Sequence, residues 1–298
     1  MVSIFTGLSA FSLTPAHADG SVDVDALAIL VDRLASAGVD SIGLLGSTGI
    51  YAYLERNERK RALAAGLEAA AGRVPVIAGI GTLRTSWSAE LARDAEQAGA
   101  AGLLLAPMSY TPLTQDEAAQ HYRAASSETG LPLCIYNNPG TTGFRFTPDL
   151  VAQLASMPGI AAIKMPLPAD NDFTSELAAL SLRTPQTFSI GYSGDWGAAS
   201  SLLSGGAAWY SVAAGLLPDI TLRLTRAAQT GRKDEARRLN TALAPLWELF
   251  RTYGSLRIMY TMADLLGLEV GDPPLPLQRV GTEVAAQVDA ALGNLATL

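Results

Sequence analysis

The feature that most constrains the fold of this sequence is a regular alternation of short apolar runs with alanine-rich, amphipathic stretches between about residues 3 and 230. Strand–helix units that build a parallel sheet buried on both faces produce this pattern. We find eight apolar runs, which is the number of strands that closes a TIM barrel. The predicted strands are 3–10, 41–45, 74–78, 102–106, 132–136, 161–164, 187–190 and 208–212.

A segment with apolar residues three and four positions apart follows each predicted strand, as in an amphipathic helix. These segments are 25–37, 57–71, 86–98, 115–129, 148–156, 173–182, 194–203 and 218–230. Three more helices are predicted after them, at 233–252, 255–266 and 280–292. No proline-, glycine- or serine-rich linker divides the chain. We therefore predict an α/β protein with a (β/α)8 TIM barrel over residues 1–230 and a C-terminal helical subdomain over 231–298.

A doubly wound parallel sheet is the alternative fold for the same alternation. That fold commonly binds a dinucleotide at a GxGxxG turn after its first strand. No such turn follows the first predicted strand here, so a dinucleotide site has no support.

Composition excludes several classes of protein. The chain carries 21 basic and 28 acidic residues, a formal net charge of −7, so no basic surface is expected to attract nucleic acid. Its apolar runs are far shorter than the roughly 20 residues of a membrane-spanning helix. One cysteine, Cys134, and two histidines, His17 and His121, rule out a disulfide framework and a Cys/His zinc cluster. We expect a cytoplasmic protein that binds no metal, no nucleic acid and no membrane.

The first residues resemble a secretory leader, because Pro15-Ala-His-Ala18 is similar to a small-residue cleavage site. A leader also carries a positively charged start, and no positive residue precedes Arg33. We interpret this stretch as the first strand and its loop.

Lys164 is the strongest candidate for a catalytic residue. It ends an apolar run that begins at Ile160, so it is predicted to lie at the C-terminal end of the sixth strand, where catalytic residues of TIM barrels collect. Burial there favours the uncharged amine, which can attack a carbonyl and form a Schiff base. The alternative is a lysine that only extends its ammonium group from the strand end to solvent.

Two other strand ends carry polar groups. The glycine-containing loop Gly46-Ser-Thr-Gly49 can present the hydroxyls of Ser47 and Thr48, together with backbone N–H groups, to a carboxylate. Tyr136 ends the fifth strand, where its phenol can relay a proton to a bound carbonyl. Loops of this composition often serve only to turn the chain, and a tyrosine at a strand end is often a packing residue.

These features, in this order, resemble the dihydrodipicolinate synthase / N-acetylneuraminate lyase family of class I aldolases. The resemblance covers nearly the whole chain. It rests on these segments: Phe11-Ser-Leu-Thr-Pro15, Asp19-Gly-Ser-Val-Asp23, Gly46-Ser-Thr-Gly49, Ala106-Pro107, Tyr136-Asn-Asn-Pro139, Ile163-Lys164, Gly191-Tyr-Ser-Gly-Asp195, Gly205-Gly206 and Ser211-Val212.

The resemblance implies a TIM-barrel lyase that binds pyruvate, or the keto-acid end of a substrate, as an imine on Lys164 without a cofactor. It implies that Ser47, Thr48 and Gly49 hold the keto-acid carboxylate and that Tyr136 moves the proton. Backbone groups near Tyr210 are expected to line the pocket. Members of the family commonly form tetramers, so we expect a homo-oligomer, with a subunit contact near Ser109 and Tyr110.

The sequence departs from the family pattern where a second substrate binds. The arginine that binds the carboxylate of the aldehyde in dihydrodipicolinate synthases aligns with Thr141, and a hydroxyl cannot replace a bidentate guanidinium. Arg145 is a candidate substitute. The tyrosine of the proton relay aligns with Ser109, and Tyr110 is the candidate to replace it. Ile50 follows Gly49 at a position where the family has an acidic residue. Met165 occupies the position of the family's glutamate after the lysine.

These departures leave three functions open. The first is condensation of pyruvate with an aldehyde, as in 4-hydroxy-tetrahydrodipicolinate synthase. The second is an aldolase, dehydratase or deaminase acting on a 2-keto-3-deoxy sugar acid or in a hydroxyproline pathway. The third is a keto-acid binder without catalysis. Among the remaining residues, we predict that Asp195 caps the helix near Trp196 and that His121 lies on an exposed helix face.

Overall fold

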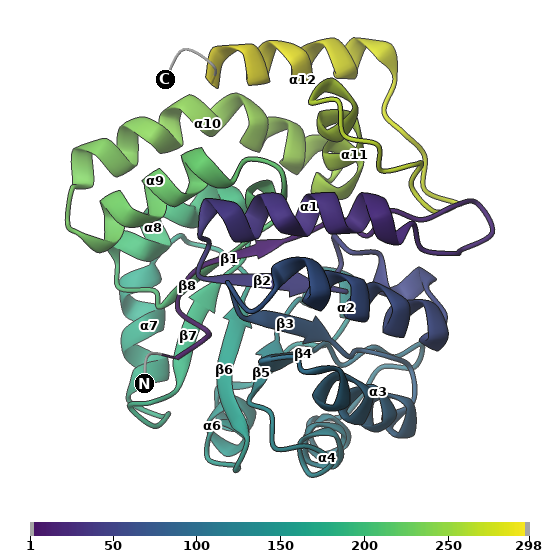
Figure 1. Cartoon of the computed structure of the whole chain (residues 1–298). Coiled ribbons are helices and arrows are strands. Elements are labelled where there is room, and N and C mark those ends of the chain that lie inside the picture. Colours follow the sequence, from purple (N-terminus) through teal and green to yellow (C-terminus); the bar gives the residue numbers. More distant parts are fainter. Residues whose placement is uncertain (1–2, 296–298) are drawn as a thin grey trace.

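The computed structural model describes residues 3–295 and shows a closed barrel of eight parallel strands, ordered as in the sequence. Figure 1 shows the strands at the centre and the helices around them. The strands are β1 Gly7–Phe11, β2 Ser41–Leu44, β3 Val76–Gly79, β4 Gly102–Leu105, β5 Leu133–Tyr136, β6 Ile160–Met165, β7 Ser189–Tyr192 and β8 Ala208–Ser211. Pairing of β1 with both β2 and β8 closes the ring, with Ser9 opposite Ser41 and Tyr210. The predicted TIM barrel is confirmed.

The helices lie where the amphipathic segments predict them. They are α1 Val24–Ala37, α2 Arg56–Ala70, α3 Thr85–Ala98, α4 Gln115–Ser126, α5 Pro139–Thr142, α6 Pro148–Ala155, α7 Phe173–Ser181, α8 Ala198–Leu203, α9 Pro218–Gln229, α10 Lys233–Tyr253, α11 Ser255–Leu265 and α12 Thr282–Leu295. Side chains at the helix starts explain several boundaries: Asp23 accepts a hydrogen bond from the Ala26 N–H, and Thr114 forms a capping box with Glu117.

Short elements were not predicted from the sequence. The 3-10 turns η1 Tyr51–Tyr53, η2 Asp195–Gly197 and η3 Ala213–Gly215, and the four-residue helix α5, follow the ends of β2, β7, β8 and β5. They are too short to show a period of three to four residues in the sequence.

The first strand begins four residues later than predicted, at Gly7. Residues before it form a turn in which the Thr6 hydroxyl donates to the Ser3 carbonyl at 2.7 Å. Phe5 is 1% exposed and belongs to the apolar cluster inside the barrel. The apolar run that suggested a longer strand therefore closes the N-terminal end of the barrel interior instead.

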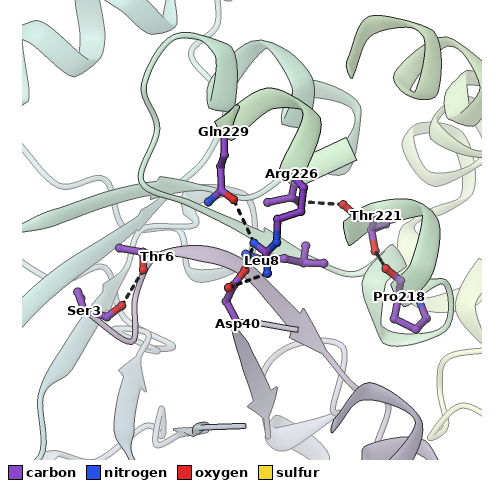
Figure 2. Close-up of polar contacts among 9 residues, drawn as sticks. Ser3, Thr6, Leu8, Asp40, Pro218, Thr221, Arg226 and Gln229 are labelled. Atoms are coloured by element: carbon purple, nitrogen blue, oxygen red, sulfur yellow. Dashed lines mark hydrogen bonds and ion pairs between the residues drawn. The ribbon is translucent and has the colours of Figure 1, made fainter. Parts of the chain in front are cut away.

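Asp40 joins three elements at this end of the barrel. Its carboxylate accepts hydrogen bonds from the Leu8 N–H at 2.7 Å and from Arg226 of α9 at 2.7 and 2.9 Å (Figure 2). A Cβ atom at Gly7 would lie 2.1 Å from this carboxylate, so only glycine fits there. The contact fixes the start of β1 against both β2 and the last barrel helix.

The C-terminal helices pack together beside the barrel, and α10 packs on α9 and α8 (Figure 1). Trp247 of α10 meets Trp209 of β8 edge to face, with ring centroids 6.4 Å apart. Neither helix α10 nor any other helix within residues 3–295 is long and apolar enough to cross a membrane. The extension is thus anchored on the outer side of the barrel through aromatic contacts.

The predicted exposure of His121 is wrong. Its side chain on α4 is buried, and its Nδ1 lies 2.9 Å from the Thr85 hydroxyl of α3. The helical pattern around His121 does not show that α3 packs over this position, so the sequence alone suggested solvent. Burial lowers the pKa of the imidazole to about 4.

This burial predicts a loss of stability in acid. A histidine in the unfolded chain titrates near about 6.5, so unfolding takes up a proton as the pH falls from that value towards about 4. Above about pH 6.5 the imidazole is neutral in both the folded and the unfolded chain, and the group costs no stability. On acidification the free energy of unfolding falls, by up to about 3 kcal/mol for this group. His121→Gln should show a smaller fall in the free energy of unfolding between about pH 7 and pH 4.5, measured with urea. His17→Gln, at an exposed position, should match the parent; equal losses in all three proteins would contradict the prediction.

Candidate active site

A cavity of about 840 Å³ opens at the C-terminal ends of the strands. Ser47 and Thr48 line it after β2, Tyr136 at the end of β5 and Lys164 on β6. The C-terminal helices supply part of its rim through Phe250 and other residues. Its position matches the face at which TIM-barrel enzymes carry their active sites.

Lys164 lies on the floor of this cavity and is 4% exposed. Its Nζ atom is 3.9 Å from the centroid of the Phe11 ring, 4.3 Å from that of Tyr136 and 5.7 Å from that of Tyr210. Among the described residues, no carboxylate lies within ion-pair distance of this amine. Aromatic faces can stabilise an ammonium ion and still leave the nitrogen without a fixed anionic partner. The amine is therefore placed to react with a ligand in the cavity.

Tyr136 pairs in register with Lys164 across β5 and β6, which brings the two side chains together. Its phenol oxygen is 3.2 Å from the Ser47 hydroxyl and accepts a hydrogen bond from the Asn138 amide at 3.0 Å. Burial alone raises the pKa of this phenol, but the charge of Lys164 and the hydrogen bonds from Ser47 and Asn138 bring it below the ordinary value. A phenol in this state is suited to donating and accepting a proton beside the amine.

The loop that carries Ser47 and Thr48 has an unusual backbone. Leu45 and Ile50, at its two ends, adopt φ values of 57° and 47°, in the left-handed region that non-glycine residues rarely occupy. Each such residue costs on the order of 1–3 kcal/mol and is found most often at functional sites. A Cβ atom at Gly49 would lie 2.9 Å from the Thr14 hydroxyl, so glycine is needed for packing there. Gly49 itself does not line the cavity.

Not all of the other predicted site residues line the cavity. Thr141 lines the cavity from α5, whereas the proposed substitute Arg145 is exposed and lies outside it. Tyr210 is buried below the cavity, with its hydroxyl 3.5 Å from the Cys134 sulfur, and the nearby Val212 forms the wall. Tyr110 is 99% exposed and does not line the cavity of this chain.

Asp195 does not cap its own helix, contrary to the prediction. Its carboxylate is buried and accepts hydrogen bonds from the Trp209 indole at 2.8 Å and from the N–H groups of Val212 and Ala213 at 3.3 and 3.0 Å. Burial outweighs these hydrogen bonds and raises the pKa of the carboxyl group. The side chain therefore fixes the end of β8 next to the cavity, through contacts that are distant in sequence.

Several residues at the site were missed in the sequence. Phe11 forms the platform under Lys164, and its place directly after the first predicted strand was the signal that could have identified it. The rim residues from α10 and α11 had no such signal, because a helix appended to a barrel can pack on any side of it. No cluster of three or more histidine, cysteine, aspartate or glutamate side chains that could hold a metal ion occurs within residues 3–295.

Comparisons with known proteins agree on one family. The model of the dihydrodipicolinate synthetase family matches residues 4–295. The 4-hydroxy-tetrahydrodipicolinate synthase of Cellvibrio japonicus is 33% identical, with 94% of this chain and 95% of the relative covered. That of Methylibium petroleiphilum is 37% identical, with 96% of each covered. The crystal structure of dihydrodipicolinate synthase from Agrobacterium tumefaciens is similar with a TM-score of 0.97 at 52% identity, covering 98% of both chains.

Proposed function

This chain belongs to the dihydrodipicolinate synthetase family and is a lyase of the class I aldolase type, and from this we propose that it binds pyruvate or a similar 2-keto acid as an imine on Lys164. The observation that carries the proposal is the position of the Lys164 amine, buried on the cavity floor against three aromatic rings. Attack of the amine on the keto carbon and loss of water give the imine. Its protonated form accepts electrons from the neighbouring carbon, so a bond to that carbon can form or break.

The loop after β2 is the proposed site for the keto-acid carboxylate. Ser47 and Thr48 both line the cavity, and Ser47 is linked to Tyr136 by a hydrogen bond. Hydroxyl and backbone N–H donors in a glycine-containing loop suit a small anion. Gly49 contributes by allowing the tight packing of this loop against Thr14.

Tyr136 is the proposed proton-transfer residue. Its ring lies beside the Lys164 amine, and its hydroxyl is within hydrogen-bond distance of the Ser47 hydroxyl. It can protonate the departing carbinolamine oxygen and take back a proton at a later step. Tyr110, 99% exposed, is proposed to reach the site of a neighbouring subunit.

The reaction of the relatives named 4-hydroxy-tetrahydrodipicolinate synthase is only one candidate for this chain. Thr141 stands where the resemblance places the arginine for a second carboxylate, and no arginine lines the cavity within the described residues. We therefore propose the imine chemistry for this chain with a second substrate of a different kind from that of the named relatives.

Trapping tests the imine directly. Incubation with pyruvate and borohydride should give a stable mass increase, and peptide mapping should place it on Lys164. Lys164→Ala should abolish it, because the other two lysines, Lys60 and Lys233, are exposed and lie outside the cavity. An adduct that persists in Lys164→Ala, or none in the folded parent with pyruvate and other keto acids, would contradict the proposal.

Tyr136→Phe separates proton transfer from binding. The substitution keeps the ring beside Lys164 and removes only the hydroxyl that contacts Ser47 and Asn138. We expect kcat to fall roughly 10²- to 10⁴-fold while the pyruvate adduct on Lys164 still forms, at a lower rate. Unchanged kcat in steady-state assays would exclude Tyr136 from the proton transfer.

Exposed apolar side chains at the C-terminal side of β3 and β4 favour a homo-oligomer, which we propose to be a tetramer. Leu83 is 59%, Trp87 47% and Tyr110 99% exposed, and the first two line one groove of about 510 Å³. Large apolar residues gathered on one surface indicate an interface.

A charge at this surface should disrupt the assembly. Leu83→Glu should lower the particle mass measured by light scattering, because a carboxylate buried between subunits lacks a partner. Leu182→Glu is the matched control, since Leu182 is 88% exposed at the end of α7. A parent that is monomeric would overturn the proposed interface, and unchanged mass in Leu83→Glu would place it elsewhere.

A further inference from the structure

The half of the cavity above Lys164 has mainly apolar walls. Leu167 and Pro168 come from the loop after β6, Trp196 from η2, and Phe250, Leu256 and Leu277 from the C-terminal helices and their connection. Trp196 lines the cavity and is 40% exposed, so part of its aromatic surface is accessible. A ligand that covers such walls gains the free energy of removing apolar surface from water.

The same half of the cavity lacks a positive charge. Among the lining residues within the described chain, Lys164 is the only cation, and the proposed imine uses it; Asp195 is the only carboxylate. A second carboxylate on a ligand would lose its hydration here without gaining a counterion.

Arginines near the cavity are engaged elsewhere. Arg257 lies beside the rim residue Gly254, and its Nη1 is 3.4 Å from the Tyr253 carbonyl. Arg59 is buried behind the Tyr51 ring and donates to the carbonyls of Gly79 and Gly81. Of the two, only Arg257 could turn towards a ligand at the rim.

Three of the hydroxyls on the walls also have partners. Thr141 and Thr142 donate to the Asn138 carbonyl at 3.3 and 3.0 Å, and Ser193 donates to the Met165 carbonyl at 3.1 Å. Each of the three can still accept a hydrogen bond, but its own proton is not available to a hydroxylated ligand.

We infer that the compound that reacts with the keto-acid imine is an aldehyde with an uncharged, mainly apolar tail, such as an aryl aldehyde. This rests on the proposed imine at Lys164. After C3 of the keto acid loses a proton, the resulting enamine attacks the aldehyde carbon, and the aldehyde oxygen takes up a proton. Water then hydrolyses the imine, restores the Lys164 amine and releases a 4-hydroxy-2-keto acid with the tail on C4.

The test compares three aldehydes with pyruvate as the common partner: benzaldehyde with an apolar tail, succinic semialdehyde with a carboxylate, and glyceraldehyde with hydroxyls. One methylene in an apolar pocket changes kcat/KM roughly 10- to 200-fold. We therefore expect kcat/KM for benzaldehyde to exceed that for each of the other two by at least about tenfold.

Variants at Leu256 examine the wall itself. Leu256→Ala should lower kcat/KM for benzaldehyde by about tenfold. Leu256→Arg should raise kcat/KM for succinic semialdehyde relative to that for benzaldehyde, because the arginine supplies the missing counterion. Leu182→Ala, at an exposed leucine outside the cavity, is the matched control for Leu256→Ala.

The results of these experiments separate failure of this inference from failure of the proposed function on which it rests. A pyruvate adduct on Lys164 with preference for succinic semialdehyde overturns the inference alone, and loss of that preference in Arg257→Gln would identify Arg257 as the counterion. Preference for glyceraldehyde, or an adduct without turnover of any of the three, also overturns it, the latter in favour of a binder without catalysis. Absence of the adduct removes the proposed function and the inference together.

Discussion

The aromatic floor of the barrel is the constraint on which the rest of the site depends. The Phe11 ring lies 3.9 Å from the Lys164 amine and meets Tyr210 edge to face at 6.3 Å. A Cβ atom at Gly43 or at Gly46 would lie 2.6 Å from this ring, so the ring requires glycine at both positions of the neighbouring strand and its loop. One packing contact thus connects the sequence of the β2 loop, which carries Ser47, with the environment of the Lys164 amine.

Much of this arrangement could be predicted because it is encoded locally. Parallel strands in a closed barrel have their C-terminal ends at one face, so Lys164, Tyr136 and Ser47 had to converge once each was placed at a strand end. The apolar run before Lys164 and the glycine loop around Ser47 were enough for that. The same logic predicted the barrel, its eight strands and the helices between them.

The failed predictions concern contacts between elements far apart in sequence. Asp195 has the residue type and the position of a helix cap, yet its partners are Trp209 on β8 and the N–H groups of Val212 and Ala213, which follow that strand. His121 lies on a helix whose neighbour, α3, covers it. For both residues the prediction used only the neighbouring sequence. The structure differs because a buried polar group needs partners, and elements far away in the sequence supply them.

The cavity is built in two parts that can vary separately. Its floor belongs to the strands, where a change at Phe11 or Lys164 would disturb the core as well as the chemistry. Its upper walls belong to loops and to the helices after the barrel, where Leu256 is only partly buried and packs against the edge of the core. Substitutions at such partly buried positions alter the ligand surface at a lower cost in stability than substitutions of the buried floor residues. A barrel of this kind can therefore keep the imine chemistry proposed for Lys164 while the second substrate changes. Thr141, at the position where the resemblance places an arginine, is the sort of difference that this division permits.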